Sequence, residues 1–200
     1  LYLSNRKVSK NSIRKGGLYE SFVPFWEFSS NQLIKSNDLN WKWTSESVEI
    51  HPNDHINFGQ SSNDTFPTAI RIAGFIESKR NLIPALKYLH ETILKKGNEY
   101  KHIVKTGRTH LMDAMPISFE QEFSGYARQI EIGIERIESA LDHLAELPMG
   151  GTAVGTGINT DPKFPSKFAK EISKLTGENF REAENHFEAQ AAVDAPVALS

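Results

Sequence analysis

Residues 116–147 read PISFEQEFSGYARQIEIGIERIESALDHLAEL, and this stretch decides the fold class. Its apolar residues recur at spacings of three and four, as one face of an α-helix requires; they are Phe119, Phe123, Tyr126, Ile130, Ile134, Ile137, Leu141 and Leu144. A helix over 116–147 would be roughly 45 Å long, more than twice the mean of globular proteins. Because such a helix cannot bury its apolar stripe against itself, we expect other long helices alongside it, in a bundle that further subunits complete.

A second helical pattern covers residues 65–96. The sequence Thr65-Phe66-Pro67 places a proline in the first turn, where its missing N–H is tolerated. Apolar residues then recur at Ile70, Ala73, Ile76, Leu82, Leu86, Leu89 and Ile93. We therefore predict a second long helix and a mostly α fold of the long-helix bundle type.

Shorter elements follow from local patterns. Residues 102–107 predict a strand or loop, and residues 163–175 predict a helix that ends at Gly177. The glycine run at 150–157 predicts a tight turn between helices. We exclude a dinucleotide-binding fingerprint there because the glycine spacing is wrong and no strand is predicted before the run.

The composition is that of a soluble globular protein. Of its 200 residues 38% are hydrophobic, and 23 Lys and Arg oppose 25 Asp and Glu, for a net charge of −2. This balance provides no basic field for nucleic acid, and no run of roughly 20 apolar residues predicts a membrane span. The absence of cysteine excludes disulfides, thiolate zinc sites, a cysteine nucleophile and cysteine-ligated iron–sulfur clusters in this chain. Any catalysis therefore uses oxygen, nitrogen and carboxylate groups.

The two ends of the chain predict a piece of a longer protein. The sequence begins at Leu1 rather than Met and stops at Ser200 inside an alanine-rich, helix-like stretch. We expect an N-terminal region at 1–60, in which residues before 49 show no sustained period. Residues 61–200 are expected to be part of a central helical-bundle domain that is truncated at its C-terminus.

Residues 60–65, which read QSSNDT, stand directly before the second helical pattern. One interpretation is a plain N-cap, because hydroxyl and amide oxygens accept the first free backbone N–H groups of a helix. The other is an anion site, because a cap needs one such residue and a run of them offers several donors beside the positive end of the helix dipole. The residues alone leave both interpretations open.

Two stretches that contain histidine are further candidates. Residues 106–110 read TGRTH, and His110 follows Thr109 on a predicted loop, where an imidazole can exchange a proton near physiological pH. Residues 51–55 read HPNDH. We expect a polar turn and no metal there, because Pro52 disfavours the helix that would align the two histidines and a third ligand is missing.

Five ordered motifs resemble class II fumarate hydratase over about residues 49–200. They are HPNDHIN at 51–57, GQSSNDTFPT at 59–68, GRTH at 107–110, QEFSGY at 121–126 and GGTAVGTGINT at 150–160. The wider fumarase/aspartase superfamily implies a mostly helical subunit whose central helices pack into a homotetramer with shared active sites. This implication agrees with the length of the helix predicted over 116–147.

The resemblance implies a role for each residue that matches a family motif. These are Ser61, Ser62, Asn63 and Thr109 for substrate binding, His110 for proton transfer, and His51, Asn53 and Asp54 for the second, non-catalytic dicarboxylate site of the family. The implied reaction is the reversible addition of water to fumarate, giving L-malate in the tricarboxylic acid cycle. It uses a small dicarboxylate substrate and neither a metal nor an organic cofactor.

Two other functions stay open. Aspartate ammonia-lyase of the same superfamily typically has Gln in place of His110 and Thr in place of Ser62, so both positions resemble the hydratase. A non-catalytic dicarboxylate-binding or scaffold remnant is the other alternative. The resemblance implies a cytoplasmic enzyme, or one of the mitochondrial matrix in a eukaryote.

The resemblance further implies a mobile loop, Gly-Ser-Ser-x-Met-Pro-x-Lys-x-Asn, which in the family supplies the base serine and a substrate-binding lysine and asparagine. The 200 residues contain no such stretch, and we expect it beyond Ser200. We therefore predict that the isolated chain does not convert malate to fumarate, because no copy of it supplies the base. The measurement is fumarate absorbance after malate is added, and appreciable turnover would contradict the assignment of the base to that loop.

Overall fold

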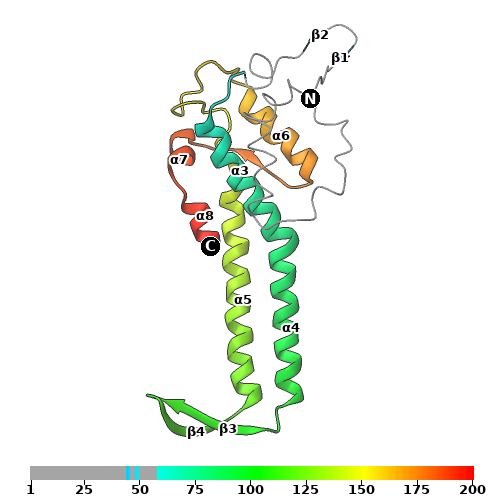
Figure 1. Cartoon of the computed structure of the whole chain (residues 1–200), viewed down its shortest axis with the longest axis vertical. Helices are drawn as coiled ribbons and strands as arrows, with labels where there is room; N and C mark the ends of the chain where they lie inside the picture. Colours follow the sequence, from blue (N-terminus) through cyan, green and yellow to red (C-terminus); the bar gives the residue numbers. More distant parts are fainter. Residues whose placement is uncertain (1–43, 46–47, 50–57) are drawn as a thin grey trace, which may run out of the picture. The chain divides into compact units, whose positions relative to one another are not determined.

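A computed structural model describes residues 44–45, 48–49 and 58–200 (Figure 1). The strands β1 (Thr44–Ser45) and β2 (Val48–Glu49) pair antiparallel. The chain divides into two compact units. The second unit is Glu77–Leu141, and the first contains the described residues before Glu77 together with 142–198. The domain limit at residue 60 stays a prediction.

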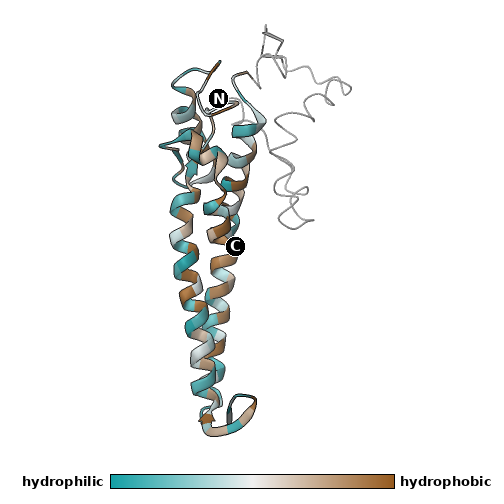
Figure 2. Cartoon of the chain, turned by 90° about the vertical axis from the view of Figure 1, so that its left-hand side faces the viewer, coloured by the Kyte–Doolittle hydropathy of each residue, from teal (hydrophilic) through white to brown (hydrophobic). Residues whose placement is uncertain are grey.

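The second unit is a pair of long helices joined by a β-hairpin. Its elements are α4 (Ile83–Glu99), β3 (Val104–Thr109), β4 (Met112–Ser118) and most of α5 (Phe119–Leu144). α4 and α5 run side by side in both views (Figure 1 and Figure 2). Gly97 permits this approach, since a Cβ atom at that position would lie only 3.2 Å from Cβ of Phe123.

The helix predicted over 116–147 is confirmed as α5, with 26 residues. Its start is fixed by a reciprocal cap, in which the Gln121 N–H donates to Oγ of Ser118 at 3.2 Å and the Ser118 N–H donates to Oε1 of Gln121 at 2.9 Å. The predicted ends were wrong, because residues 116–118 belong to β4 and residues 146–147 form a short strand. The strand or loop predicted over 102–107 overlaps β3. Ile134, Leu141 and Leu144 of the predicted stripe are buried.

The helix predicted over 65–96 is also confirmed, with a defect near its middle. α3 (Ser62–Glu77) passes into a π-helical turn at Ser78–Leu82, and α4 follows. The N–H of Ile83 bonds to the carbonyl of Ser78, five residues back. Pro84 explains the defect, because proline has no N–H and its ring clashes with the carbonyl four residues earlier in a regular helix.

The buried face of α3 differs from the predicted apolar stripe. Its buried residues are Asp64, Thr65, Thr68, Ala69, Arg71 and Phe75, of which four are polar. The predicted positions Ile70, Ala73 and Ile76 are only half-buried. Periodicity alone assigned the wrong face here, because Asp64 and Arg71, which bond to other segments, occupy the interior in place of aliphatic side chains.

The first unit contains a short parallel strand pair, β5 (Glu146–Leu147) with β6 (Arg181–Glu182). The helix α6 (Phe164–Thr176) connects them, and α7 (His186–Ala191) and α8 (Asp194–Leu199) follow. The helix predicted over 163–175 is thus confirmed, and it ends at Gly177, whose φ is +76°. The core of this unit includes Leu144, Leu147, Met149, Ile172 and Phe180. Most described residues are helical, and none of the described helices is long and apolar enough to cross a membrane.

A buried guanidinium ties four segments of the first unit together. Nη1 of Arg71 donates to the carbonyl oxygens of His143 and Glu146 at 3.0 and 3.2 Å, and Nη2 donates to that of Ala189 at 3.5 Å. The first and last of these carbonyls lie in the final turns of α5 and α7, where backbone acceptors lack helical partners. The buried Arg71 therefore donates to three backbone carbonyl groups, of which the bond to Ala189 is buried and the other two are partly buried.

We predict that Arg71→Met lowers the free energy of unfolding by about 3 kcal/mol, because three backbone carbonyls lose a buried charged donor while the side-chain volume is roughly kept. Urea denaturation followed by circular dichroism measures this change. The matched control is Arg136→Met, which replaces an exposed arginine of α5 and should shift the free energy by no more than about 0.5 kcal/mol. Equal effects of the two substitutions would contradict the assigned role.

Candidate active site

α3 begins with a reciprocal cap. Oγ of Ser61 accepts the N–H of Asn63 at 3.2 Å, and Oδ1 of Asp64 accepts the N–H of Ser61 at 2.9 Å. This is the capping-box pattern, in which the third residue after the N-cap bonds back to it. The structure therefore shows a cap at residues 61–64, in which two of the backbone donors that an anion would use are already bonded within the chain. The anion-site interpretation stays a prediction.

The second carboxylate oxygen of Asp64 connects α3 to the glycine loop, residues 150–157. Oδ2 accepts the N–H of Gly150 at 3.1 Å and that of Thr152 at 2.9 Å. The side chain is fully buried. Burial raises the pKa of the Asp64 carboxyl above 3.8, and the backbone N–H bonds offset part of that rise. One carboxylate thus joins segments that are more than eighty residues apart in sequence.

The glycine loop forms the predicted turn and is bonded from two further sides. Nδ2 of Asn63 donates to the carbonyl of Ala153, and Nε2 of Gln190 in α7 donates to that of Thr152, both at 2.7 Å. Gly150 has a φ of +100°, and a Cβ atom there would overlap the ring of Pro165, so only glycine fits. The short strand β5 does precede the loop, which the sequence analysis did not predict, although the glycine spacing still does not match a dinucleotide site.

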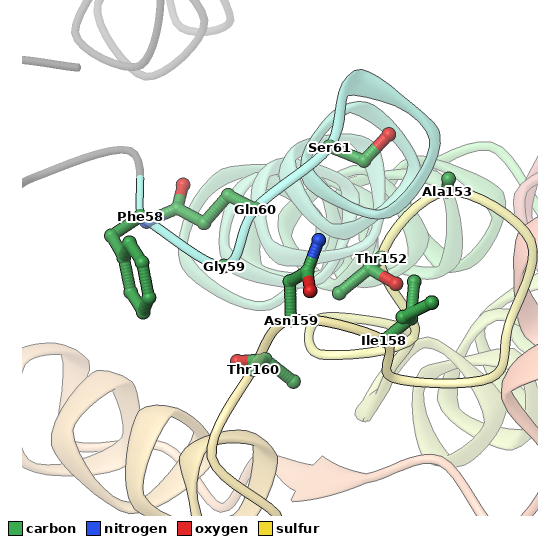
Figure 3. Close-up of a pocket in the computed structure, with 9 residues that line it drawn as sticks. All are labelled: Phe58, Gly59, Gln60, Ser61, Thr152, Ala153, Ile158, Asn159 and Thr160. Atoms are coloured by element: carbon green, nitrogen blue, oxygen red, sulfur yellow. The ribbon is translucent and has the colours of Figure 1, made fainter. Parts of the chain in front are cut away.

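Two cavities of the first unit border the start of α3. The first, of about 640 Å³, is lined by Phe58, Gly59, Gln60, Ser61, Thr152, Ala153, Ile158, Asn159 and Thr160 (Figure 3). The second, of about 440 Å³, is lined by Ser62, Asn63, Phe66, Pro67, Ile70, Ala153, Val154, Phe187, Gln190, Ala191 and Val193. None of these lining residues is charged. The three predicted substrate residues therefore lie together at the helix start but face two cavities, Ser61 the first and Ser62 with Asn63 the second.

The remaining two predicted residues of the catalytic site lie at the tip of the β3–β4 hairpin, in the second unit. Thr109 pairs with Met112, which leaves His110 and Leu111 as a two-residue turn with φ of +51° and +59°. Positive φ is strained for residues other than glycine. Below the turn, Nε of Arg108 contacts Oδ1 of Asp113 at 2.9 Å across the strands. Thr109 and His110 are exposed and line neither cavity.

Several sequence predictions fall elsewhere. His51, Asn53 and Asp54, assigned to a second dicarboxylate site, lie outside the described residues. Within the part of the chain that the structure describes, no group of three or more His, Asp or Glu side chains could ligate a metal.

Sequence reasoning missed the central position of Asp64. A signal was present, because Ser61 and Asp64 have the S-x-x-D spacing of a capping box. No sequence pattern marks Gln190, because its bond to the glycine loop joins residues that lie 38 positions apart in the sequence. Asn159, whose side chain extends toward the start of α3 in Figure 3, belongs to a quoted motif but was not assigned a role.

Comparison with known proteins assigns the family. Residues 27–200 match a family model described as lyase. The chain belongs to this lyase family. Class II fumarate hydratase of Corynebacterium glutamicum is 59% identical over 154 residues, which are 76% of this chain and 33% of that protein. Mitochondrial fumarate hydratase of Rhizopus oryzae is 52% identical over 194 residues, 91% of this chain and 39% of the relative.

Solved structures show the same likeness. A class II fumarase from Schistosoma mansoni superposes with a TM-score of 0.74 at 34% identity, covering 92% of this chain and 40% of that one. The fumarate lyase:delta crystallin from Brucella melitensis, in a structure bound to cobalt, superposes with a TM-score of 0.68 at 36% identity, covering 75% and 32%. The resemblance to class II fumarate hydratase is thereby confirmed. The chain spans about a third of the length of the curated relatives it matches.

The buried Asp64 predicts how the free energy of unfolding of this lyase chain depends on pH. Because its folded-state pKa is raised above 3.8, the folded chain takes up a proton at a higher pH than the unfolded chain does. The free energy of unfolding of the wild type should therefore rise relative to that of Asp64→Asn as pH falls through the raised pKa toward 3.8. Urea denaturation of both proteins between about pH 7 and about pH 4 measures this difference. A difference that stays constant or shrinks on acidification would contradict the raised pKa.

Proposed function

We propose that the protein to which this chain belongs catalyses the reversible hydration of fumarate to L-malate. The observation that carries the proposal is the 59% identity to class II fumarate hydratase over 154 residues. The polar, uncharged residues at the start of α3 support it, because hydroxyl and amide groups suit a small diacid with one hydroxyl group.

The chemistry of the reaction requires such donors. Removal of a proton from C3 of malate leaves a carbanion that spreads into the adjacent carboxylate, giving an aci-carboxylate with two negative charges on its oxygens. Donors already oriented toward such developing charge are typically worth ~3 to 4 kcal/mol each when they are removed singly. We assign this binding role to Ser61, Ser62 and Asn63, whose side chains face the two cavities at the helix start.

His110 is assigned the transfer of a proton to or from the water that leaves or adds, and Thr109 the binding of a carboxylate. The exposed position of both residues at the hairpin tip is compatible with insertion into a site formed with other segments. The strained backbone at His110 supports this assignment, since strain of this kind concentrates at functional sites.

A dianionic substrate beside the buried Asp64 needs compensating positive charge. The residues that line the two cavities include no Lys, Arg or His, and burying charges without opposite partners is costly. We therefore propose that the cation comes from another segment, in agreement with the lysine of the family's mobile loop. A second dicarboxylate site at His51, Asn53 and Asp54 belongs to the same proposal.

We further propose a homotetramer with shared active sites. Large apolar side chains remain exposed on the long helices of the second unit, namely Tyr88, Leu89 and Leu94 on α4 and Tyr126 on α5. Figure 2 shows hydrophobic residues recurring along both helices. Faces of this kind suit packing against the equivalent helices of other copies.

The test of the proposed reaction uses the protein expressed from its complete reading frame. Fumarate absorbance is followed after addition of L-malate and, separately, of L-aspartate. Formation of fumarate from malate supports the hydratase. Formation from aspartate alone would favour the ammonia-lyase, and binding of malate by calorimetry without turnover would favour a non-catalytic remnant.

We predict that His110→Asn in the active protein lowers kcat by about 10²-fold or more and changes KM little, because proton transfer is lost while the substrate anchors remain. Initial rates with malate and fumarate give both constants. His102→Asn is the matched control, since His102 is another exposed histidine of the second unit. An unchanged kcat in His110→Asn would remove this residue from the mechanism.

A further inference from the structure

The carboxylate of Asp64 fixes the shape of both cavities. Ala153 lines both, and Thr152 and Ser61 line the first. Asp64 bonds the backbone N–H of Ser61 and of Thr152 directly, and the carbonyl of Ala153, one residue further, accepts Nδ2 of Asn63. Asp64 therefore makes two of the three side-chain bonds that join the helix start to the glycine loop, and Asn63 makes the third.

A neutral side chain of the same shape cannot make these bonds. All three partners of Asp64 are backbone N–H donors, so both of its oxygens must accept. An asparagine offers one acceptor oxygen, and its NH₂ group would face a donor on the other side. Either the bond to Ser61 or the bonds to Gly150 and Thr152 would be lost.

The buried carboxylate of Asp64 carries a desolvation cost that its three backbone N–H bonds offset in part. Among the described residues only backbone N–H groups bond Asp64, and its side chain is fully buried. Burying a carboxylate without a cationic partner is unfavourable, and burial accordingly raises its pKa. The three bonds require the helix start and the glycine loop in one arrangement, beside residues assigned to substrate binding, which indicates a geometric requirement of the site.

We propose that Asp64 is a positioning residue, which sets Ser61 and Asn63 against the glycine loop in the geometry that binds the dicarboxylate. This inference rests on the proposed function. Asp64 itself does not line either cavity and is assigned no contact with substrate.

The kinetic test compares Asp64→Asn with wild type, after wild-type hydratase activity has been measured. We expect kcat/KM to fall by about 10²-fold, the loss typical of a misplaced binding group, with a raised KM as part of it. Circular dichroism measures the folded fraction. If Asp64 were only structural, apparent kcat would scale with the folded fraction and KM would stay at the wild-type value, which would overturn the proposal.

The control variant is Asp161→Asn. Oδ1 of Asp161 accepts the N–H of Lys163 at 2.8 Å, so this substitution also affects a bond from an aspartate to the backbone near the glycine loop, but at an exposed position. We expect wild-type KM for Asp161→Asn. A KM raised as much in Asp161→Asn as in Asp64→Asn would overturn the proposal. Asp64→Glu keeps two acceptor oxygens, and partial recovery of kcat/KM in this variant further supports the proposal.

Hydrogen exchange without substrate tests the same bonds independently of the reaction. In the wild type the amides of Gly150 and Thr152 should be protected, and exchange in a peptide covering 148–155 should be at least about tenfold faster in Asp64→Asn. Exchange in α6 should be unchanged. Exchange of both amides at the rate of an unstructured peptide in the wild type would overturn the proposal even if Asp64→Asn did not fold. Absent wild-type hydratase activity would instead refute the proposed function.

Discussion

Three backbone N–H groups converge on the buried carboxylate of Asp64, and the geometry of the candidate site depends on this convergence. A helix start and a glycine-rich loop are both rich in unsatisfied donors, so neither can be buried against the other without an acceptor between them. A carboxylate supplies two acceptor oxygens in one small group. The polar residues of α3 thereby become interior residues, and the apolar stripe of the same helix turns toward the half-exposed side.

The exchange of polar and apolar faces in α3 explains which features could be predicted from the sequence. α5 followed from spacing alone because its stripe is apolar and includes the buried Ile134, Leu141 and Leu144. Its start differs from the predicted one, because the cap formed by Ser118 and Gln121 begins the helix after Pro116. In α3 the interior face is polar, and hydrophobic periodicity contains no information about partners over eighty residues away. The π-helical turn before Pro84 is explained by the chemistry of proline. It could not be predicted, because a proline at this position can equally well break the helix.

The candidate site was predictable as a set of residues and not as an arrangement. Motifs identified Ser61, Ser62 and Asn63 together, since they are adjacent in sequence. Ser61 precedes α3 and faces one cavity, whereas Ser62 and Asn63 lie in its first turn and face the other, an arrangement that adjacency in sequence does not predict. Thr109 and His110 lie at a hairpin tip in a different unit, and their assignment depends on the family resemblance.

Charge links the local geometry to the proposed assembly. The cavities at the helix start provide hydroxyl and amide groups and no cation, with one negative charge buried behind them. In the proposed function, a dianion bound there would gain hydrogen bonds but also repulsion from Asp64, and we propose that positive charge from another segment makes its binding free energy favourable. The lining of the two cavities supplies no such charge among the described residues, and the proposed homotetramer with shared active sites would supply it from another segment. The exposed apolar side chains of α4 and α5 provide the surface on which such an association would depend.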